Sequence, residues 1–421
     1  VATGLSGDSL VVESMASSGL PDLSSMLRAI GWRVATLHFA AGWVVPLFVV
    51  ASMTRWFGAN RSFREGLSLW RFALVAALAM EVPYLLMAIL LGPEFPSLFG
   101  GLLGLAIVLP VARRGWLLPK GGHPWDFPDR SQWPSSWGSK LVLLSADGRG
   151  RALAGTTGLN DNERHETAQV SASLRPEDIS PARTLLAWCP YLLVAGLLVL
   201  SRLDQVPLKV WLKQATIDFT DIFGTNISKI SEPLYLPGTI FIVVSIICIG
   251  LFRMNLDRVR QAWSSSLRTV IMASVALVFT VPMVQVFIHS DGGFAGYSKM
   301  PLALALGIEA WVGQLWPLIA PLVGGMGAAI AGSNTVSNMM FALFQFQVAV
   351  KINVDPLWIV ALQAVGGAAG NTICVHNVVT ASAVAGLSGQ EGSIIRTTLP
   401  LFLWYTTVTG IFGIAVVFAF R

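Results

Sequence analysis

Residues 332–338 read Gly-Ser-Asn-Thr-Val-Ser-Asn, a dense run of hydroxyl and amide side chains between two apolar stretches. The preceding stretch, 302–331, is longer than one membrane-crossing helix needs, whereas 339–350 would form about 18 Å of helix, too short to cross a bilayer. An interrupted helix or a re-entrant hairpin fits these lengths. A helix that restarts at membrane depth presents unpaired N–H groups and the positive end of its dipole to a protein- or water-lined space. The pattern therefore predicts a site for a small carboxylate.

A second interruption is predicted at 366–371, Gly-Gly-Ala-Ala-Gly-Asn, between two further apolar stretches. Glycines let a ligand approach the backbone closely, but they also suit tight helix packing, and both interpretations stay open. Because buried polar groups without partners are costly, we expect the polar side chains here to meet a ligand. The substrate-binding candidates are Ser333, Asn334, Thr335, Ser337 and Asn338 at the first interruption, and Gly370, Asn371 and Asn377 at the second.

Three ionisable side chains are candidates for binding a proton. Glu81 lies in the middle of an apolar stretch, where an acidic residue costs about 2.5–3.5 kcal/mol on the insertion scale. It either relays protons or stays neutral against a carbonyl freed by Pro83. His376 adjoins the second interruption, and an imidazole is the side chain that changes charge near neutral pH. Glu309 is the third candidate, whereas His38, near the end of a predicted span, is interpreted as structural.

The elements that position these residues are apolar helices. The 421-residue chain is 54% hydrophobic and 12% charged, against about 25% charge in a typical soluble protein. The apolar runs are continuous rather than alternating, which excludes transmembrane β-strands. We predict an all-α, polytopic transmembrane helix bundle with discontinuous or re-entrant helices. Its clear spans, near the roughly 20 residues that a crossing helix needs, are 35–53, 72–91, 96–112, 184–201, 236–252, 269–288 and 398–420.

Basic residues concentrate in every second connection between these spans. Arginines are frequent in 54–71, 113–183 and 253–268 and scarcer around 92–95 and 203–235. The positive-inside rule then places the three Arg-rich connections in the cytoplasm.

The chain divides into three predicted regions. These are transmembrane helices over 1–112 with a short extracytoplasmic start, a cytoplasmic loop over 113–183, and a second membrane region over 184–421 that holds the interruptions at 332–338 and 366–371. The loop is rich in Pro, Gly, Ser and charge, as is typical of a mobile or accessory segment. Trp211 and Phe219, mixed with lysines and aspartates, predict an interfacial helix within 203–235.

No pattern typical of an enzyme is present in the sequence: it has no GxSxG, HExxH, P-loop or CxxC motif. Cys189, Cys248 and Cys374 show neither zinc spacing nor a disulfide framework. We therefore expect no enzyme activity, no cofactor and no metal site. The net charge of +5 resides in short loops, so the lipid bilayer, rather than nucleic acid, is the expected partner.

At its two interruptions the sequence resembles the L-lactate permease family of bacterial carboxylate transporters. The resemblance is carried by AGSNTVSNMMFALFQF at 331–346 and ALQAVGGAAGNTICVHNVVTASAVAGLSGQEGSIIR at 361–396. It implies a multi-pass bundle in the cytoplasmic, or inner, membrane that imports L-lactate and related 2-hydroxy monocarboxylates such as glycolate by symport with protons. It also implies an inverted-repeat architecture with hairpins.

The chain departs from the family pattern at its start and at two site residues. Family members begin well before Val1 and carry there a Gly-rich segment with a Glu, the repeat mate of 332–338. The chain has no initiator Met and no signal-peptide pattern over 1–34, so we expect a fragment of a longer protein. Some members carry Asp in place of Asn334 and Lys in place of Asn371.

The resulting hypothesis is a secondary transporter whose two interruptions hold the carboxylate and hydroxyl of lactate, with His376 or Glu81 carrying the coupled proton. Paired broken helices are a common way for such transporters to hold a substrate. Two alternatives stay open: a sodium-coupled carboxylate transporter, and a membrane sensor or scaffold without flux. A channel is not favoured, because the sequence has no repeated charged ring or filter-like run.

Overall fold

The computed structural model describes residues 5, 8–119, 181–202, 206–220, 229–288, 290, 296, 298–384 and 390–419. Within these ranges the chain is almost entirely helical, which confirms the predicted all-α class. The chain forms two compact units, one from residues 1–142 and 276–421 and the other from 143–275. The division passes through the long helix α12 (Leu256–Ile288). Each unit is described by itself.

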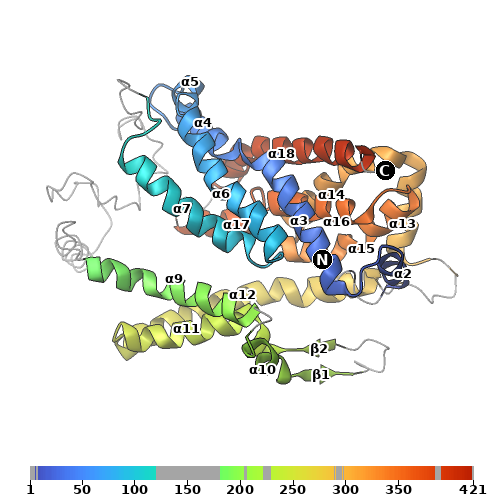
Figure 1. The fold of residues 1–421 in the computed structure, drawn as a ribbon, viewed down its shortest axis with the longest axis horizontal. Helices are drawn as coiled ribbons and strands as arrows, with labels where there is room; N and C mark the ends of the chain where they lie inside the picture. The colour runs from blue at the N-terminus through green and yellow to red at the C-terminus, as the bar shows by residue number, and fades with distance from the viewer. Residues whose placement is uncertain are drawn as a thin grey trace. The chain divides into compact units, whose positions relative to one another are not determined.

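The larger unit consists of two groups of helices (Figure 1). The N-terminal group is α2 (Ser9–Ser17), α3 (Leu23–Gly42), α4 (Val45–Trp56), α5 (Phe63–Leu67), α6 (Trp70–Leu90) and α7 (Pro96–Arg113). The C-terminal group is the last part of α12, from residue 276 on, followed by α13 (Met300–Trp311), the 3-10 turn η6 (Gly313–Leu315), α14 (Trp316–Ala331), α15 (Asn334–Lys351), α16 (Pro356–Gly370), α17 (Val375–Val384) and α18 (Glu391–Ala419). α3 and α18 both pack against α16, and α18 also packs along α14 (Figure 1).

Seven helical segments of the described chain are long and apolar enough to cross a membrane. Their surfaces expose large apolar side chains, such as Leu90 at 70% and Leu185 at 66%, which lipid would cover. The chain is a multi-pass membrane protein, as its composition predicted. The seven segments are residues 23–56, 70–90, 96–113, 185–202, 313–331, 356–382 and 391–419.

The predicted spans differ from these segments in three places. The span predicted at 35–53 is two successive helices, α3 and α4, with a turn at Trp43 and Val44 before Pro46. The span predicted at 236–252 is α11 (Pro237–Leu251), which at 15 residues is shorter than a full crossing. The third difference is in the set of crossing segments. The span predicted at 269–288 lies in α12, which is not among the seven, whereas 313–331 and 356–382, which hold or adjoin the predicted interruptions, are themselves long enough to cross.

A polar cap fixes the start of α3. Asp22 Oδ1 accepts a hydrogen bond from the backbone N–H of Ser25 at 2.8 Å, and Ser25 Oγ accepts one from the N–H of Asp22 at 3.4 Å. This reciprocal arrangement is a capping box. Hydrogen bonds from Ser24 and Ser25 hold the pKa of the exposed Asp22 carboxyl below its ordinary value.

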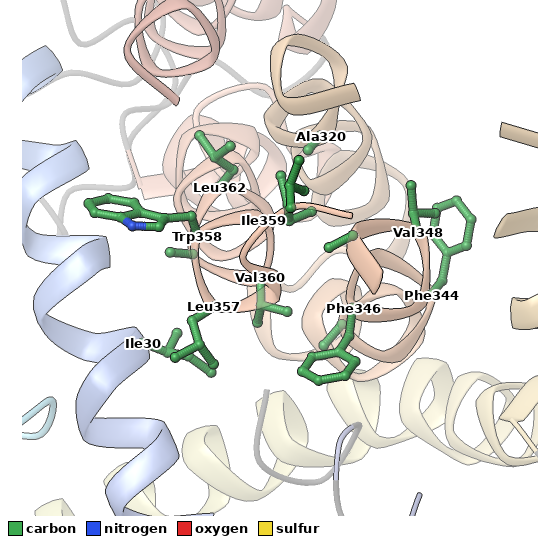
Figure 2. Packing of buried hydrophobic residues seen from close by; sticks show 14 of the residues in the cluster. Ile30, Ala320, Phe344, Phe346, Val348, Leu357, Trp358, Ile359, Val360 and Leu362 are labelled. Carbon is green, nitrogen blue, oxygen red and sulfur yellow. The ribbon is translucent and has the colours of Figure 1, made fainter. Parts of the chain in front are cut away.

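The core of the larger unit lies where α15 and α16 meet α3, α13, α14 and α18. Phe346, Ile359 and Leu362 are fully buried there. Figure 2 shows Ile30 of α3 beside Leu357 of α16, so the N-terminal and C-terminal helix groups share this core. Arg33 of α3 adds an ion pair to Asp355 at 2.9 Å, and the Asp355 carboxylate also accepts from the N–H of Leu357, capping α16.

The smaller unit contains α9 (Pro181–Arg202), α10 (Leu208–Gln214), a 3-10 turn η5 (Pro233–Tyr235), α11 and the first part of α12. The helix predicted within 203–235 is short: Trp211 lies in α10, whereas Phe219 lies in a strand, and an interfacial position stays a prediction. Residues 203–235 hold the seven-residue α10 and a two-stranded antiparallel sheet, β1 (Ile217–Phe219) paired with β2 (Lys229–Ser231). The run Thr-Ile-Asp-Phe at 216–219 contains two β-branched residues, which favour a strand.

The orientation of the chain in the membrane and the cytoplasmic location of the loop 113–183 stay predictions. Most of the loop 113–183 lies outside the described residues, which stop at 119 and resume at 181. Arg113 is in the last turn of α7.

Candidate substrate site

The first interruption is a tight turn between α14 and α15. Gly332 ends α14 with φ +74°, in the left-handed region, and Ser333 begins α15. The Ser333 hydroxyl accepts a hydrogen bond from the backbone N–H of Val336 at 3.4 Å. A left-handed glycine followed by a serine cap closes a helix and opens the next with little chain between them. The irregular segment is therefore shorter than predicted, and Asn334 to Asn338 lie in the first turns of an 18-residue helix.

α14 and α15 form an antiparallel hairpin around this turn. The Ser337 hydroxyl, fully buried, donates to the carbonyl oxygen of Gly324 at 2.7 Å. Near the other end of the hairpin, Trp316 Nε1 donates to Gln345 Oε1 at 2.7 Å. Of the interrupted helix and the re-entrant hairpin that the sequence left open, the two helices fold back on each other as a hairpin, with its turn at 332–333. Its position in the membrane stays a prediction.

The first turn of α15 presents polar groups of three kinds. An α-helix leaves the N–H groups of its first residues without intrahelical acceptors, which here are those of Asn334 and Thr335. Thr335 is exposed, Asn334 is half-buried, and Asn338 is 7% exposed. Asn338 Nδ2 donates to Asn334 Oδ1 at 2.9 Å. Backbone donors, one exposed hydroxyl and a pair of amides therefore share this end of the helix.

The second interruption lies at residues 371–374, after the predicted glycines rather than within 366–371. α16 continues as a helix through Gly370, and α17 begins at Val375. Gly366 and Gly370 are buried in the contact between α16 and α14. A Cβ at Gly366 would overlap the Pro321 carbonyl oxygen, and one at Gly370 would overlap that of Gly325. Of the two interpretations left open for these glycines, close helix packing describes these contacts.

The two interruptions lie next to each other. A Cβ built on Gly332 would be 3.5 Å from His376 Cβ, so the α14–α15 turn contacts the first turn of α17. The remaining glycine of α16, Gly367, lies against the Asn334 side chain. A Cβ at Gly367 would overlap Asn334 Oδ1. Asn377 Nδ2 donates to the carbonyl oxygen of Asn371 at 3.4 Å. The N-terminal ends of α15 and α17 therefore belong to one region, with α16 beside it.

Two amide oxygens in this region are buried without a hydrogen-bond partner: Asn338 Oδ1 and Asn371 Oδ1. A buried acceptor without a donor costs about 1–3 kcal/mol. Such acceptors suit a ligand that carries an O–H donor, whereas the N–H groups of the helix starts suit its carboxylate.

A buried polar chain beside the site was not predicted. Gln345 Nε2 donates to Gln363 Oε1 at 3.0 Å, and Gln363 Nε2 donates to Ser337 Oγ at 3.1 Å. With the bond from Trp316 to Gln345, this glutamine chain links α14, α15 and α16, and both glutamines have 0% exposure. The available signal was a glutamine within a mainly apolar stretch of each helix, Gln345 in α15 and Gln363 in α16, because a buried amide needs hydrogen-bond partners.

The structure separates the three proton candidates. His376 is exposed at the start of α17, and Glu309 is exposed on α13. Glu81 is half-buried in α6, in contact with Gly42 of α3, and its Oε2 is buried without a hydrogen-bond partner. Within the described ranges, no group of three or more His, Cys, Asp and Glu side chains lies together in a way that could hold a metal ion.

Comparison with known proteins gives one consistent result. The sequence profile described as L-lactate permease matches residues 10–132 and 154–420. A relative from Haemophilus influenzae, whose name assigns it to the L-lactate permeases, is 27% identical over 401 residues, covering 90% of this chain and 64% of its own length. The glycolate permease of Escherichia coli K12 is 23% identical over 90% of this chain and 62% of its own length.

The L-lactate permease of Escherichia coli K12 matches a shorter part, with 28% identity over 41% of this chain and 30% of its own length. The chain spans less than two thirds of the length of the curated relatives that it matches. No solved structure matches it significantly. Because the family profile covers most of the residues, including both helix interruptions, the chain belongs to the L-lactate permease family.

Proposed function

We propose that this chain forms part of a secondary transporter that imports L-lactate and related 2-hydroxy monocarboxylates, such as glycolate, across the cytoplasmic membrane together with protons. Membership of the family supports the transport of a small carboxylate. The names of the relatives, L-lactate permease and glycolate permease, point to 2-hydroxy acids.

The observation that carries the proposal is the meeting of two helix N-termini at Gly332 and His376. Each N-terminus supplies backbone donors and a positive dipole end, and both favour a carboxylate. In this proposal, Ser333, Asn334 and Thr335 bind the carboxylate from one side.

The unpartnered oxygens of Asn338 and Asn371 supply the second half of the recognition. Lactate and glycolate carry a 2-hydroxyl group that can donate to such an oxygen, whereas the keto group of pyruvate cannot. A site with a buried acceptor disfavours a ligand that leaves it unpaired. We therefore expect the inhibition constant of pyruvate to be at least roughly tenfold higher than that of glycolate, equivalent to about 1.4 kcal/mol.

The test is uptake of labelled L-lactate by the full-length protein in proteoliposomes, with glycolate, pyruvate and succinate as competitors. The proposal expects accumulation when the lumen is alkaline, inhibition by glycolate, and loss of accumulation when a protonophore is added. Accumulation that ignores the protonophore but requires sodium would replace proton coupling by sodium coupling. Lactate binding without uptake would indicate a sensor instead.

A further inference from the structure

Glu81 contacts the backbone of a neighbouring helix instead of a polar partner. It lies in α6, and a Cβ added at Gly42 of α3 would overlap its Oε1. Its Oε2 is buried and unpaired. Pro83 frees the carbonyl of Ala79 from helix hydrogen bonding, but that carbonyl faces Gly104 of α7, 3.3 Å from a Cβ built there. The Glu81 carboxyl group therefore does not bond to the carbonyl oxygen of Ala79. That bond was the basis of the purely structural interpretation of Glu81.

One helical turn further along the α3–α6 contact lie two more ionisable side chains. His38 precedes Gly42 by four residues and Tyr84 follows Glu81 by three, so each pair shares a helix face. The rings of His38 and Tyr84 meet edge-on, with 5.8 Å between their centroids. His38 Nδ1 lies 2.6 Å from the hydroxyl oxygen of Tyr405 on α18. Glu81, Tyr84, His38 and Tyr405, here called the Glu81 cluster, thus bring together α3, α6 and α18.

The far end of the Glu81 cluster reaches the substrate site. Tyr405 packs against a small apolar group formed by Ala369, Ile373 and Phe402. Ile373 belongs to the second interruption, between α16 and α17. The cluster therefore runs from the middle of α6 to the backbone that, in the proposed function, faces the substrate.

Fixed charges near Glu81 are few in the described part of the chain. Arg33 is engaged with Asp355 at 2.9 Å, and the Arg55 guanidinium lies over the ring of Phe63. Arg71 precedes Glu81 by ten residues, about 15 Å along a helix. The ionisable residues on the helices that α6 packs against are Arg28, Arg33 and His38 on α3, Arg55 on α4 and Arg113 on α7; α6 adds Arg71 and Tyr84, and α18 carries Glu391, Arg396 and Tyr405.

An ionised Glu81 in this setting carries a charge without a contacting cation, and such a charge is costly inside a membrane protein. Protonation forms an O–H bond on one carboxyl oxygen and removes the charge. Release of that proton restores the carboxylate. A change in the access of water to Glu81 is sufficient for the carboxyl group to bind and release this proton.

We propose that Glu81 is the proton-binding residue of the transport cycle, and that His38 and Tyr405 are positioning residues that link its protonation to the interruption between α16 and α17. This inference rests on the proposed function, since it assigns the coupled proton of that transport. It favours Glu81 over His376 and Glu309, which are both exposed.

The experiment compares the wild-type protein with Glu81→Gln, at full length in proteoliposomes, in three assays. The first is lactate accumulation driven by an alkaline lumen, and the second is exchange of external labelled lactate for internal unlabelled lactate. The third follows external alkalinisation with a pH dye when lactate is added. The amide keeps the shape of the protonated carboxyl but cannot release a proton. We expect exchange within about twofold of wild type, equivalent to about 0.4 kcal/mol, with accumulation and alkalinisation lost.

Each outcome bears on a different proposal. Absence of lactate flux in the wild-type protein would overturn the proposed function and this inference with it. Accumulation that persists in Glu81→Gln would overturn only this inference. So would loss of exchange in both Glu81→Gln and Glu81→Asp when both proteins keep the wild-type melting temperature, because Glu81 would then serve transport itself rather than coupling.

Two further variants test the positioning residues. Tyr405→Phe removes the hydroxyl that contacts His38, and we expect it to shift the pH dependence of accumulation while leaving exchange in place. His38→Gln should shift it as well. The matched controls are Tyr191→Phe and Glu13→Gln, which change an exposed tyrosine of α9 and an exposed glutamate of α2 and should leave both profiles unchanged. Unshifted profiles in both cluster variants would overturn the assigned link.

Discussion

The backbone of Gly366 in α16 lies directly against the carbonyl oxygen of Pro321 in α14, with no room for a side chain between them. Gly366→Ala should therefore force the two helices apart. Overpacking of this kind costs about 1–3 kcal/mol, so we expect a lower melting temperature of the purified protein in detergent. Weaker lactate uptake should follow, because α16 carries the second interruption at its end.

Gly101 provides the matched control for this substitution. It lies in α7, and a Cβ built there has no neighbour within 4 Å. Gly101→Ala should leave the melting temperature unchanged or raise it, since alanine is the better helix former. Equal melting temperatures for the two alanine variants would contradict the close contact at Gly366.

The glutamine chain should show strong energetic coupling. Gln363→Leu removes the donor to Ser337 Oγ and the nearer of the two acceptors of Gln345 Nε2, leaving only the Ala320 carbonyl oxygen at 3.3 Å. We expect a cost of about 1–3 kcal/mol. The double variant Gln345→Leu/Gln363→Leu should be less destabilised than the sum of the two single variants, because groups in one hydrogen-bonded network do not act independently. Melting temperatures of the four proteins measure this. Strict additivity would rule out the network.

The turn between α14 and α15 should tolerate asparagine better than alanine at position 332. Gly332 has φ +74°, and a left-handed backbone costs an ordinary residue about 1–2 kcal/mol. Asparagine adopts this region more readily than alanine does. We expect Gly332→Ala to lower both stability and lactate uptake, and Gly332→Asn to lower them less. The reverse order of the two variants would argue against a strained turn.

Asn334 and Asn371, one at each interruption, should respond to charge together. Asn334→Asp alone places a negative charge at the first turn of α15, where it repels a carboxylate, and we expect the apparent KM for lactate to rise roughly tenfold, about 1.4 kcal/mol. Adding Asn371→Lys should recover part of that loss, because the two interruptions lie together. Uptake kinetics of both single variants and the double variant test this. A double variant as weak as Asn334→Asp would contradict compensation.

The cap of α3 predicts a pH dependence of stability. The pKa of Asp22 is held below its ordinary value near 3.8 by hydrogen bonds from Ser24 and Ser25. A carboxyl whose pKa is lowered by folding contributes stability above its unfolded value, and that contribution is lost as pH falls through the folded value. The melting temperature of Asp22→Ala should therefore lie below wild type at neutral pH and approach it in strong acid. A difference that is constant with pH would contradict this.

The sequence predicted the fold class and the approximate positions of the two helix interruptions because both depend on local patterns. Long apolar runs defined most of the helices, and the Gly-Ser-Asn pattern located the first turn to within a few residues. The second interruption was placed too early because glycines such as Gly366 serve helix packing as readily as they break a helix.

Contacts between distant parts of the chain could not be predicted in this way. His38 and Tyr405 are 367 residues apart, and no periodicity connects them. For this reason His38 was interpreted as a structural residue near the end of a span. The hydrogen-bond partners of Gln345 and Gln363 could not be predicted either, because a single sequence shows an amide in an apolar stretch without showing its acceptor.

If the protein transports lactate as proposed, the hydrogen bonds from Trp316 through Gln345 and Gln363 to Ser337 restrict how it can alternate between its two faces. Sliding α15 past α16 by one residue would break amide bonds where neither water nor lipid headgroups can replace them. α14, α15 and α16 must therefore travel as a single block. The flexibility that opens and closes a pathway would then fall to a link at the edge of that block, residues 371–374 between α16 and α17.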